Sequence, residues 1–470
     1  MRPAPRSPRV RSLTTTFGFV ACALVSLTCA GQPAVTAAPA TPPASEPSTG
    51  AEVAPPVEEP RVAEVTPAGP AFEPIDDGVP GLRIPIYDPS GKALAHFHDA
   101  LRRAAAGEGQ ARLAFYGASH VAADLFTGYL RTQLQTRFGD AGHGFVLPAH
   151  PWRTYRHQGI TIESNRRLWT GIKIRASSLE VDHYGLAGTA IETTRAGAWG
   201  ALTTSTRGEL GRSVSRYDLY YLAQPGGGAI EVKIDGRAVE TVRTAASAKG
   251  AGYATFEVED GAHRFEVRTV GNGPVRIFGV ASERTEPGVI VDTLGINGAR
   301  ARYHLLWEDE MYREHLARRS PDLITLAYGT NESGDDDVPI ATYEARMRQV
   351  VSRVREIVPE ASCLLIGPSD RPIRENGDIL DRPRTLELVE AQKRVSAELG
   401  CGFFDLVEFM GGPMSMVDWV AHEPAYGAPD HIHYTRRGYL RLGEALHYAL
   451  LYGLEQAPEQ APDGITSDNP

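Results

Sequence analysis

Along the second half of the chain, short apolar runs alternate with segments in which apolar residues recur about every three to four positions. The runs lack polar alternation, which is typical of strands buried on both faces of a parallel sheet. The intervening segments have the spacing of amphipathic helices. We expect strands at 289–294, 322–328, 363–366 and 402–406, followed by helices at 299–319, 343–357, 385–399 and 437–454. This rhythm predicts a parallel sheet that helices cover on both faces.

The same rhythm also occurs earlier in the chain. Leu113–Tyr116 is a short apolar run that ends at Gly117, and helical spacing follows from Leu125 to Phe138. Ser119 therefore lies in a turn between a strand and a helix. In open α/β sheets, ligands bind at the carboxyl ends of the strands, so this serine is expected to face the binding crevice. A turn or helix-capping role would also explain a serine here.

Between the first strand-helix pair and the others lies a region without a helical pattern, residues 148–285. We expect its strands at 217–222, 229–234, 239–243, 253–258, 263–270 and 275–280, each rich in β-forming residues and separated from the next by turn signals. Short strands at near-regular spacing predict a β-sandwich or jelly roll. Because this region interrupts the α/β rhythm, we expect it to be inserted into an α/β domain formed by 75–147 and 286–454. It can then overhang the binding crevice.

The first 30 residues have the order of a secretory signal, because arginines precede an apolar stretch at 17–29 that is too short to span a bilayer well. Cys29 is placed as the lipidated cysteine of a bacterial lipoprotein would be, and simple cleavage explains the segment equally well. Residues 31–74 predict a disordered linker, and 455–470 a disordered tail. We therefore expect an exported protein in the periplasm, at the outer membrane through Cys29, or outside the cell.

Charge and cysteine content narrow the class of protein. The formal net charge is −10 with basic and acidic residues interspersed, which does not indicate a nucleic-acid partner. No second hydrophobic segment of the sequence approaches the length of a membrane span. Outside the signal segment only Cys363 and Cys401 remain, and they form either one disulfide or two buried thiols. The oligomeric state does not follow from the sequence.

Three further loops follow expected strands of the same sheet and offer groups that acyl transfer needs. They contain Gly298, Asn331, and the pair Asp430 and His433. A serine hydroxyl needs a base to take its proton as it attacks, and His433 can serve while Asp430 holds its other ring nitrogen. Negative charge on the substrate carbonyl oxygen requires N–H donors, which the Gly298 backbone and the Asn331 amide can supply. The sequence therefore predicts serine-dependent acyl chemistry.

Each of these residues also has a simpler interpretation. Asp430, His431 and His433 could ligate a metal ion, but no third block of ligands is evident in the sequence, and we predict neither a metal nor another cofactor. Asp430 could instead cap the last helix. Gly295 competes with Gly298 for the oxyanion role. Their joint occurrence, each after a strand, favours catalysis.

The motifs around Ser119, Gly298, Asn331 and Asp430 to His433 resemble the four sequence blocks of the SGNH, or GDSL, hydrolases. The resemblance implies a flavodoxin-like three-layer α/β/α fold and esterase activity. It implies that Ser119 is the nucleophile, His433 the base and Asp430 its orienting partner. It also implies an oxyanion hole formed by Ser119, Gly298 and Asn331.

A closer likeness is to peptidoglycan O-acetylesterases, which also carry a histidine after the serine, here His120, and a carbohydrate-binding-type β-sandwich between the first two blocks. His120 would line the substrate pocket, although a histidine packed on the sheet is equally compatible. The chain departs from the family at Ala118, where an aspartate normally braces the turn, and its loss could slow the enzyme. Tryptophans in or near the insert could stack on sugars or fill a core: Trp152, Trp169 and Trp199.

Taken together, these features predict a serine esterase that removes acyl groups, especially acetyl groups, from a polysaccharide or peptidoglycan through an acyl-enzyme. An O-acyltransferase would share the nucleophile and differ in whether a sugar hydroxyl replaces water at the acyl-enzyme. The absence of the usual aspartate at Ala118 leaves open a glycan-binding protein with a weakened site.

Overall fold

The computed structural model describes residues 83–174 and 181–455, all of which belong to one compact unit, Glu64–Pro470. The predicted signal segment with Cys29, the linker at 31–74 and the tail from 456 lie outside the described residues. Within the described ranges, no helix combines the length and hydrophobicity that a membrane crossing requires.

A five-stranded parallel sheet forms the centre of the α/β part. Its strands lie in the order β13 (Gly288–Gly295), β1 (Gln110–Gly117), β14 (Leu323–Ala327), β15 (Ser362–Ile366) and β18 (Gly402–Phe404). By position in the chain this order is second, first, third, fourth, fifth, which is the flavodoxin-like arrangement. The expected fold class is confirmed. β13 lies on one side of β1, whereas the later strands β14, β15 and β18 follow on the other side. The topological switch point is therefore between β1 and β14, and ligands bind at such a point.

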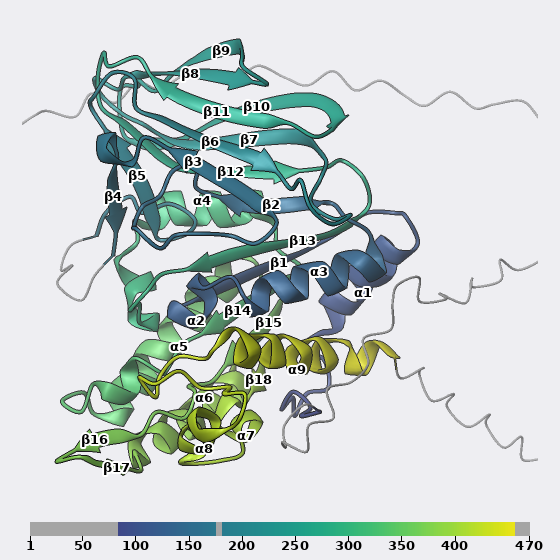
Figure 1. Cartoon of the computed structure of the whole chain (residues 1–470), viewed down its shortest axis with the longest axis vertical. Helices are drawn as coiled ribbons and strands as arrows, with labels where there is room; N and C mark the ends of the chain where they lie inside the picture. The colour runs from purple at the N-terminus through teal and green to yellow at the C-terminus, as the bar shows by residue number, and fades with distance from the viewer. Residues whose placement is uncertain (1–82, 175–180, 456–470) are drawn as a thin grey trace, which may run out of the picture. The chain divides into compact units, whose positions relative to one another are not determined.

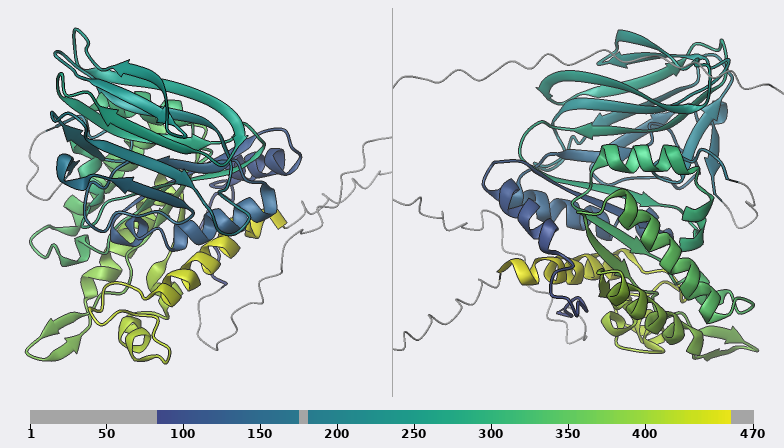
Figure 2. Two further views of the ribbon diagram at one scale, coloured as in Figure 1. Left: turned by 45° about the horizontal axis from the view of Figure 1, so that its top comes forward. Right: turned by 180° about the vertical axis from the view of Figure 1, so that it is seen from behind.

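Helices cover both faces of this sheet. Alternate side chains of each strand point to opposite faces, so each strand contributes to two hydrophobic clusters. In β1, Leu113 and Phe115 belong to one hydrophobic cluster, and Ala114 and Tyr116 belong to another. The first cluster includes α1 (Ala95–Ala105), α3 (Phe126–Phe138) and α9 (Arg436–Glu455), and the second includes α4 (Asp309–Arg319), α5 (Ile340–Ile357) and α6 (Pro383–Glu398). Figures 1 and 2 show these two helical layers.

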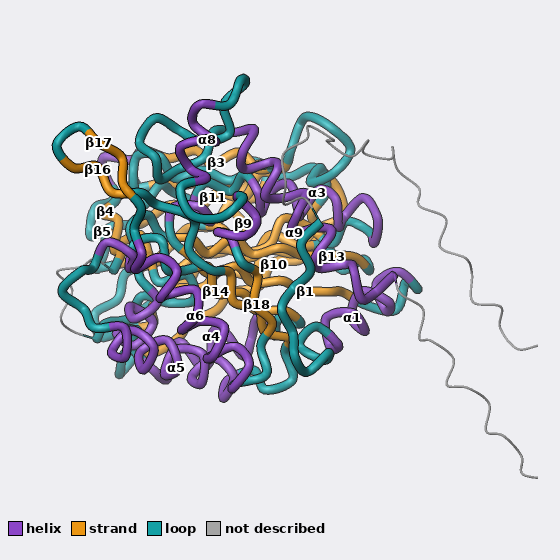
Figure 3. The backbone as a smooth tube through the Cα atoms, turned by 90° about the horizontal axis from the view of Figure 1, so that it is seen from below, coloured by secondary structure: helices purple, strands orange, loops and turns teal. Residues whose placement is uncertain are grey.

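Short elements occupy the loops at the sheet ends. They are α2 (Ser119–Ala122), α7 (Leu406–Met410), α8 (Ser415–Ala421), the 3₁₀ helices η1 (Arg166–Leu168), η2 (Ala301–Leu306) and η3 (Glu332–Gly334), and the hairpin strands β16 (Ile373–Glu375) and β17 (Asp378–Leu380). Figure 3 shows this hairpin at the periphery of the α/β part.

Two antiparallel sheets lie between α3 and β13 in the chain. One has the order β10 (Gly250–Gly261), β7 (Val214–Ala223), β12 (Val275–Glu283), β5 (Thr189–Thr193) and β4 (Thr170–Lys173), and the other has the order β3 (Ile160–Ser164), β6 (Trp199–Thr204), β11 (Arg264–Thr269), β8 (Ala229–Ile234) and β9 (Arg237–Arg243). β2 (Gly142–Val146) pairs with β12, so the antiparallel part begins before the expected boundary at 148.

The sheet that contains β7 is buried on both faces. Tyr217 and Leu219 pack in a cluster with residues of the second antiparallel sheet, such as Phe265. Tyr220 and Leu222 point the other way, into the cluster that contains α4 and the parallel sheet. The antiparallel sheets therefore share a hydrophobic core with the α/β part. Figure 1 shows β2 between β12 and β13.

The expected helix at 299–319 is wrong, because the structure divides it into η2 and α4. Trp307 between them is extended. The Glu308 carboxylate then accepts hydrogen bonds from the N–H groups of Glu310 (3.2 Å) and Met311 (2.9 Å). This side chain caps the amino end of α4 and starts a new helix at Asp309.

Cys363 and Cys401 form a disulfide, which answers the question that the sequence left open. Cys363 lies in β15, and Cys401 directly precedes β18, which pairs with β15. Both residues are buried. The bridge thus joins two neighbouring strands that are 38 residues apart in sequence at this point.

Removal of this bridge is expected to destabilise the protein. The Cys363→Ala/Cys401→Ala double variant should lose about 2–4 kcal/mol in free energy of unfolding, since the bridge restricts the unfolded chain. Urea denaturation would measure the loss. Dithiothreitol should destabilise the wild type and leave the double variant unchanged. Equal stability of the two proteins under oxidising conditions would refute a stabilising role for the bridge.

Candidate active site

Ser119 is the first residue of α2, two residues after the end of β1. The turn depends on Gly117, because a Cβ atom there would lie 2.3 Å from Val121 Cγ2 and 2.9 Å from the Ala327 carbonyl oxygen. The glycine thus allows α2 to pack directly against the end of its own strand. Ser119 is half-buried. Its position at the carboxyl end of β1 places it at the switch point of the sheet.

A continuous chain of hydrogen bonds joins Ser119, His433 and Asp430. The Ser119 Oγ lies 2.9 Å from Nε2 of His433. The other ring nitrogen of this histidine, Nδ1, lies 2.7 Å from Oδ2 of Asp430. A hydroxyl, an imidazole and a carboxylate in this order form the arrangement in which the imidazole can take the hydroxyl proton.

The Asp430 carboxylate also organises the loop that carries the histidine. Its Oδ1 accepts hydrogen bonds from the N–H groups of Ile432 (3.0 Å) and His433 (2.9 Å). Partial burial alone would raise the pKa of Asp430, but the hydrogen bonds from His433 and Ile432 outweigh it and lower the pKa to about 2. The last helix begins later, at Arg436, where the Gly438 N–H donates to Thr435 Oγ1. Asp430 therefore holds its own loop and does not cap α9.

The two glycines that compete for an oxyanion role differ in their surroundings. Gly295 is buried, and a Cβ atom there would lie 2.2 Å from the Ala122 backbone nitrogen, so this glycine allows β13 to pack against α2. Gly298 is exposed, has a φ of +77°, and has no atom within 4 Å of a Cβ position. Close packing thus explains why position 295 is a glycine, whereas the positive φ at position 298 is a backbone conformation that favours glycine.

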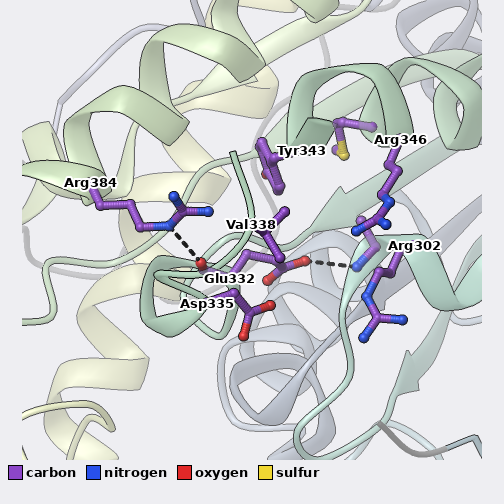
Figure 4. A pocket seen from close by; sticks show the side chains of 9 residues that line it. Arg302, Glu332, Asp335, Val338, Tyr343, Arg346 and Arg384 are labelled. Atoms are coloured by element: carbon purple, nitrogen blue, oxygen red, sulfur yellow. Dashed lines mark hydrogen bonds between the residues drawn. The ribbon is translucent and has the colours of Figure 1, made fainter. Parts of the chain in front are cut away.

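The loop that carries Asn331 is tied to the loop of Gly298. The Asn331 Nδ2 donates to the Ala299 carbonyl oxygen at 2.9 Å, and an amide group has a second N–H that this bond leaves available. Next to it, the buried Glu332 carboxylate accepts from the Ala301 N–H at 2.8 Å, as Figure 4 shows. Burial raises the pKa of Glu332. No local sequence pattern distinguishes Glu332, because only the fold brings it to the η2 loop.

The Ser119 and His433 side chains line a cavity of about 510 Å³. Asn297 contributes to its wall from the loop after β13. Thr154, Arg156 and Gln158 contribute from a segment between β2 and β3. The segment that follows β2 therefore does border the crevice, as the sequence position of the β-rich region suggested.

Residues 260–441 match the family described as "GDSL-like Lipase/Acylhydrolase family". A solved structure described as "Peptidoglycan O-acetylesterase in action" is similar over 81% of this chain and 99% of that chain, with 27% sequence identity and a TM-score of 0.65. Residues 260–441 thus carry the match to the GDSL-like, or SGNH, hydrolase family. The resemblance predicted from the sequence motifs is thus confirmed at the level of the family.

Two more distant structures also match the chain that carries this SGNH domain. A family two carbohydrate esterase from Cellvibrio japonicus has 14% identity and a TM-score of 0.26, and the match covers 61% of this chain and 98% of that chain. An acetyl-xylooligosaccharide esterase from Geobacillus Stearmophilus has 19% identity and a TM-score of 0.27, covering 37% and 76%. Comparison with curated proteins returns no match.

His120 of the SGNH domain is buried and does not line the cavity. Its Nδ1 lies 3.0 Å from the Tyr439 hydroxyl, and its ring stacks on Tyr434 with 4.7 Å between ring centroids. Burial, and to a lesser extent the nearby His433, lowers the pKa of His120 to about 3. Of the two placements that the sequence left open for His120, the structure agrees with the packed one, against Tyr434 and Tyr439.

The tryptophans and the possible metal ligands are also placed by the structure. Trp169 is buried, and its indole N–H donates to the Trp199 carbonyl oxygen at 3.0 Å. His431 is buried, and Arg374 lies 2.8 Å from its Nδ1. Among the residues that the structure describes, no group of three or more His, Cys, Asp or Glu side chains could hold a metal ion.

A buried ion pair that contacts the segment of Gln158 was not predicted from the sequence. Asp124 is fully buried and lies 3.2 Å from the Arg131 guanidinium. Its carboxylate also accepts hydrogen bonds from Thr293 Oγ1 at 2.8 Å and from the Gln158 N–H. Burial alone would raise the pKa of Asp124, but Arg131 and the nearby His157 hold it well below its usual range. This network joins α3, β13 and the segment of Gln158. Although Ala118 replaces the usual aspartate, Ser119 and His433 lie within hydrogen-bonding distance.

Proposed function

We propose that the protein is an exported serine esterase that removes O-acyl groups, in particular O-acetyl groups, from a polysaccharide or peptidoglycan. The observation that carries this proposal is the hydrogen-bond chain from Asp430 through His433 to Ser119, which ends in a cavity of about 510 Å³. The similarity to an O-acetylesterase structure at a TM-score of 0.65 supports the same substrate class.

In the proposed mechanism, Ser119 Oγ attacks the ester carbonyl carbon while His433 Nε2 takes the hydroxyl proton. Asp430 keeps the proton on Nδ1 and stabilises the imidazolium that forms. The oxyanion receives hydrogen bonds from the N–H groups of Ser119 and Gly298 and from the second amide N–H of Asn331. His433 then gives its proton to the departing sugar oxygen. Water, deprotonated by the same histidine, hydrolyses the acyl-enzyme to acetate and free serine.

Two features support the proposed export. The Cys363–Cys401 disulfide fits an oxidising compartment. The first 30 residues have the charge and hydrophobicity order of a secretory signal. We place the protein in the periplasm or at the outer membrane, with Cys29 as the candidate site of lipid attachment.

The reaction can be tested by its products. Purified protein should release free acetate from O-acetylated peptidoglycan or an acetylated polysaccharide, and none from the same polymer after alkaline deacetylation. Chromatography of the products with and without an added acceptor sugar measures hydrolysis and transfer together. Acetyl transfer to the sugar without free acetate would contradict hydrolysis and indicate an acyltransferase. Polymer binding without any loss of acetyl groups would contradict an enzymatic function.

A further inference from the structure

The cavity at Ser119 is lined by positive and not by negative side chains. Arg156 and Arg436 are part of its wall together with His433, and among the described residues no aspartate or glutamate is. Asp430 is exposed and is not part of this wall, and its carboxylate is paired with the other ring nitrogen of His433. The formal net charge of the chain is −10, so the charge of this wall is opposite in sign to that of the whole chain.

These two arginines lack the partners that most arginines of the structure have. Arg156 and Arg436 are exposed, and neither makes a hydrogen bond or ion pair with another described residue. By contrast, Arg319 binds two carboxylates, those of Glu283 and Asp292. A guanidinium presents N–H groups in a fixed plane that matches a carboxylate. Two unpaired guanidinium groups beside a nucleophile are therefore suited to an anionic ligand.

The backbone on both sides of Arg156 is anchored. Tyr155 is buried, and its hydroxyl accepts a hydrogen bond from the Leu147 N–H at 3.0 Å. His157 is also buried, and its Nδ1 lies 3.2 Å from Nε2 of His143. With both neighbours held inside, the Arg156 side chain is directed outward to the cavity wall. An anchored segment loses little conformational freedom when a ligand binds.

Arg436 also starts from a fixed position. It is the first residue of α9 and follows Thr435, whose hydroxyl donates to the Ala425 carbonyl oxygen at 2.7 Å. His433 lies three residues before it, so the guanidinium and the imidazole come from the same short segment. The two arginines thus reach one cavity from two separate parts of the fold.

We propose that Arg156 and Arg436 form a carboxylate subsite, and that the preferred substrate is an acylated sugar that carries a carboxylate close to the ester. This proposal rests on the proposed esterase function and names the charge of its substrate. The carboxylate can be attached directly to the sugar ring, as in a uronic acid, or be carried by an ether substituent, as in muramic acid without a stem peptide. Both present the same anionic group to the arginines.

Matched ester pairs test the subsite. The first pair is an acetylated methyl glucuronoside and the equally acetylated methyl glucoside; the second is 6-O-acetyl-N-acetylmuramic acid and 6-O-acetyl-N-acetylglucosamine. In each pair only the first member carries a carboxylate. For at least one pair, kcat/KM of the wild type should be about 10- to 100-fold higher for the anionic ester, as expected for charge-assisted hydrogen bonds. The pair that shows the preference identifies the source of the carboxylate.

Variants then assign the preference to the two residues. Arg156→Gln and Arg436→Gln should each reduce the anionic-to-neutral ratio of kcat/KM about tenfold, and added NaCl should reduce the ratio of the wild type. Arg153→Gln is the matched control, since Arg153 is exposed in the same segment and does not line the cavity. It should leave the ratio unchanged.

The outcomes separate the two proposals. If the wild type hydrolyses both members of both pairs equally, the subsite is refuted and the esterase function stands. A preference that survives both arginine substitutions would also refute the subsite. If no ester is hydrolysed, the proposed function fails, and the subsite fails with it.

Discussion

Substitution of Ser119 by alanine is expected to reduce kcat for acetyl-ester hydrolysis by at least about 10,000-fold. The variant removes the hydroxyl that lies 2.9 Å from His433 Nε2, so no acyl-enzyme can form. Residual activity would come from the oxyanion donors and substrate binding alone. Release of p-nitrophenol from p-nitrophenyl acetate measures the loss, with the acetylated polymer as a second substrate.

A matched control is Ser247→Ala. Ser247 lies in the loop between β9 and β10 and is exposed. This variant should retain wild-type kcat and KM. Far-UV circular dichroism should be the same for both variants, because neither removes a large or fully buried side chain. Retention of more than about one tenth of the activity by Ser119→Ala would mean that another group is the nucleophile.

Asp430→Asn is expected to have the second-largest effect, a loss of about 1,000- to 10,000-fold in kcat, by comparison with the aspartate of serine-protease triads. An asparagine that keeps its oxygen toward the N–H groups of Ile432 and His433 presents its NH₂ group to Nδ1. The imidazole then carries its proton on Nε2 and cannot accept one from Ser119. Steady-state kinetics of acetyl-ester hydrolysis measures the loss.

The pH profile separates this tautomer effect from a simple loss of charge. The pKa of Asp430 is lowered to about 2, so the carboxylate is ionised throughout the range above about pH 4. Asp430→Asn should therefore reduce kcat at every pH above 4. The exposed Asp378→Asn on the β16–β17 hairpin serves as control and should behave as wild type. A defect that disappears at high pH would contradict the assigned orienting role.

The parallel sheet could be predicted because its strands are buried on both faces. Every residue of β13 and β15 is buried, and in sequence each strand contains consecutive apolar residues without polar alternation, Val289 to Val291 and Cys363 to Ile366. The loops that follow such strands must lie at one edge, so the sequence also indicated that Ser119, Asn331 and the Asp430 loop would meet. The hydrogen-bond distances between Ser119, His433 and Asp430 agree with that expectation.

The cavity wall could not be predicted in the same way. Arg156 lines the cavity of Ser119 because the segment after β2 is anchored by contacts between residues far apart in the chain, such as Gln158 with Asp124. No local pattern distinguishes this arginine from the many others in the sequence. Short strands with mixed polarity, such as β4 (Thr170–Lys173), also lack a clear period. Their place is set by neighbouring strands rather than by local preference.

His120 shows why the sequence left two placements open for one residue. Its place after the serine suggested a pocket position, but the first turn of α2 directs its ring toward Tyr434 and Tyr439. Tyr439 lies in α9, and Tyr434 lies just before it. Which side of a one-turn helix faces inward depends on the packing of α9, and the sequence near Ser119 does not contain that information.

The central claim is that Ser119 becomes acylated during turnover. The most direct measurement is peptide mass spectrometry of protein that is acid-quenched during hydrolysis of p-nitrophenyl acetate. We predict an added acetyl group on the peptide that contains Ser119, with fragment ions that place it on this residue, and no such adduct in His433→Ala. Steady hydrolysis by the wild type with the acetyl group on a different residue, or with no adduct at any quench time, would contradict the account.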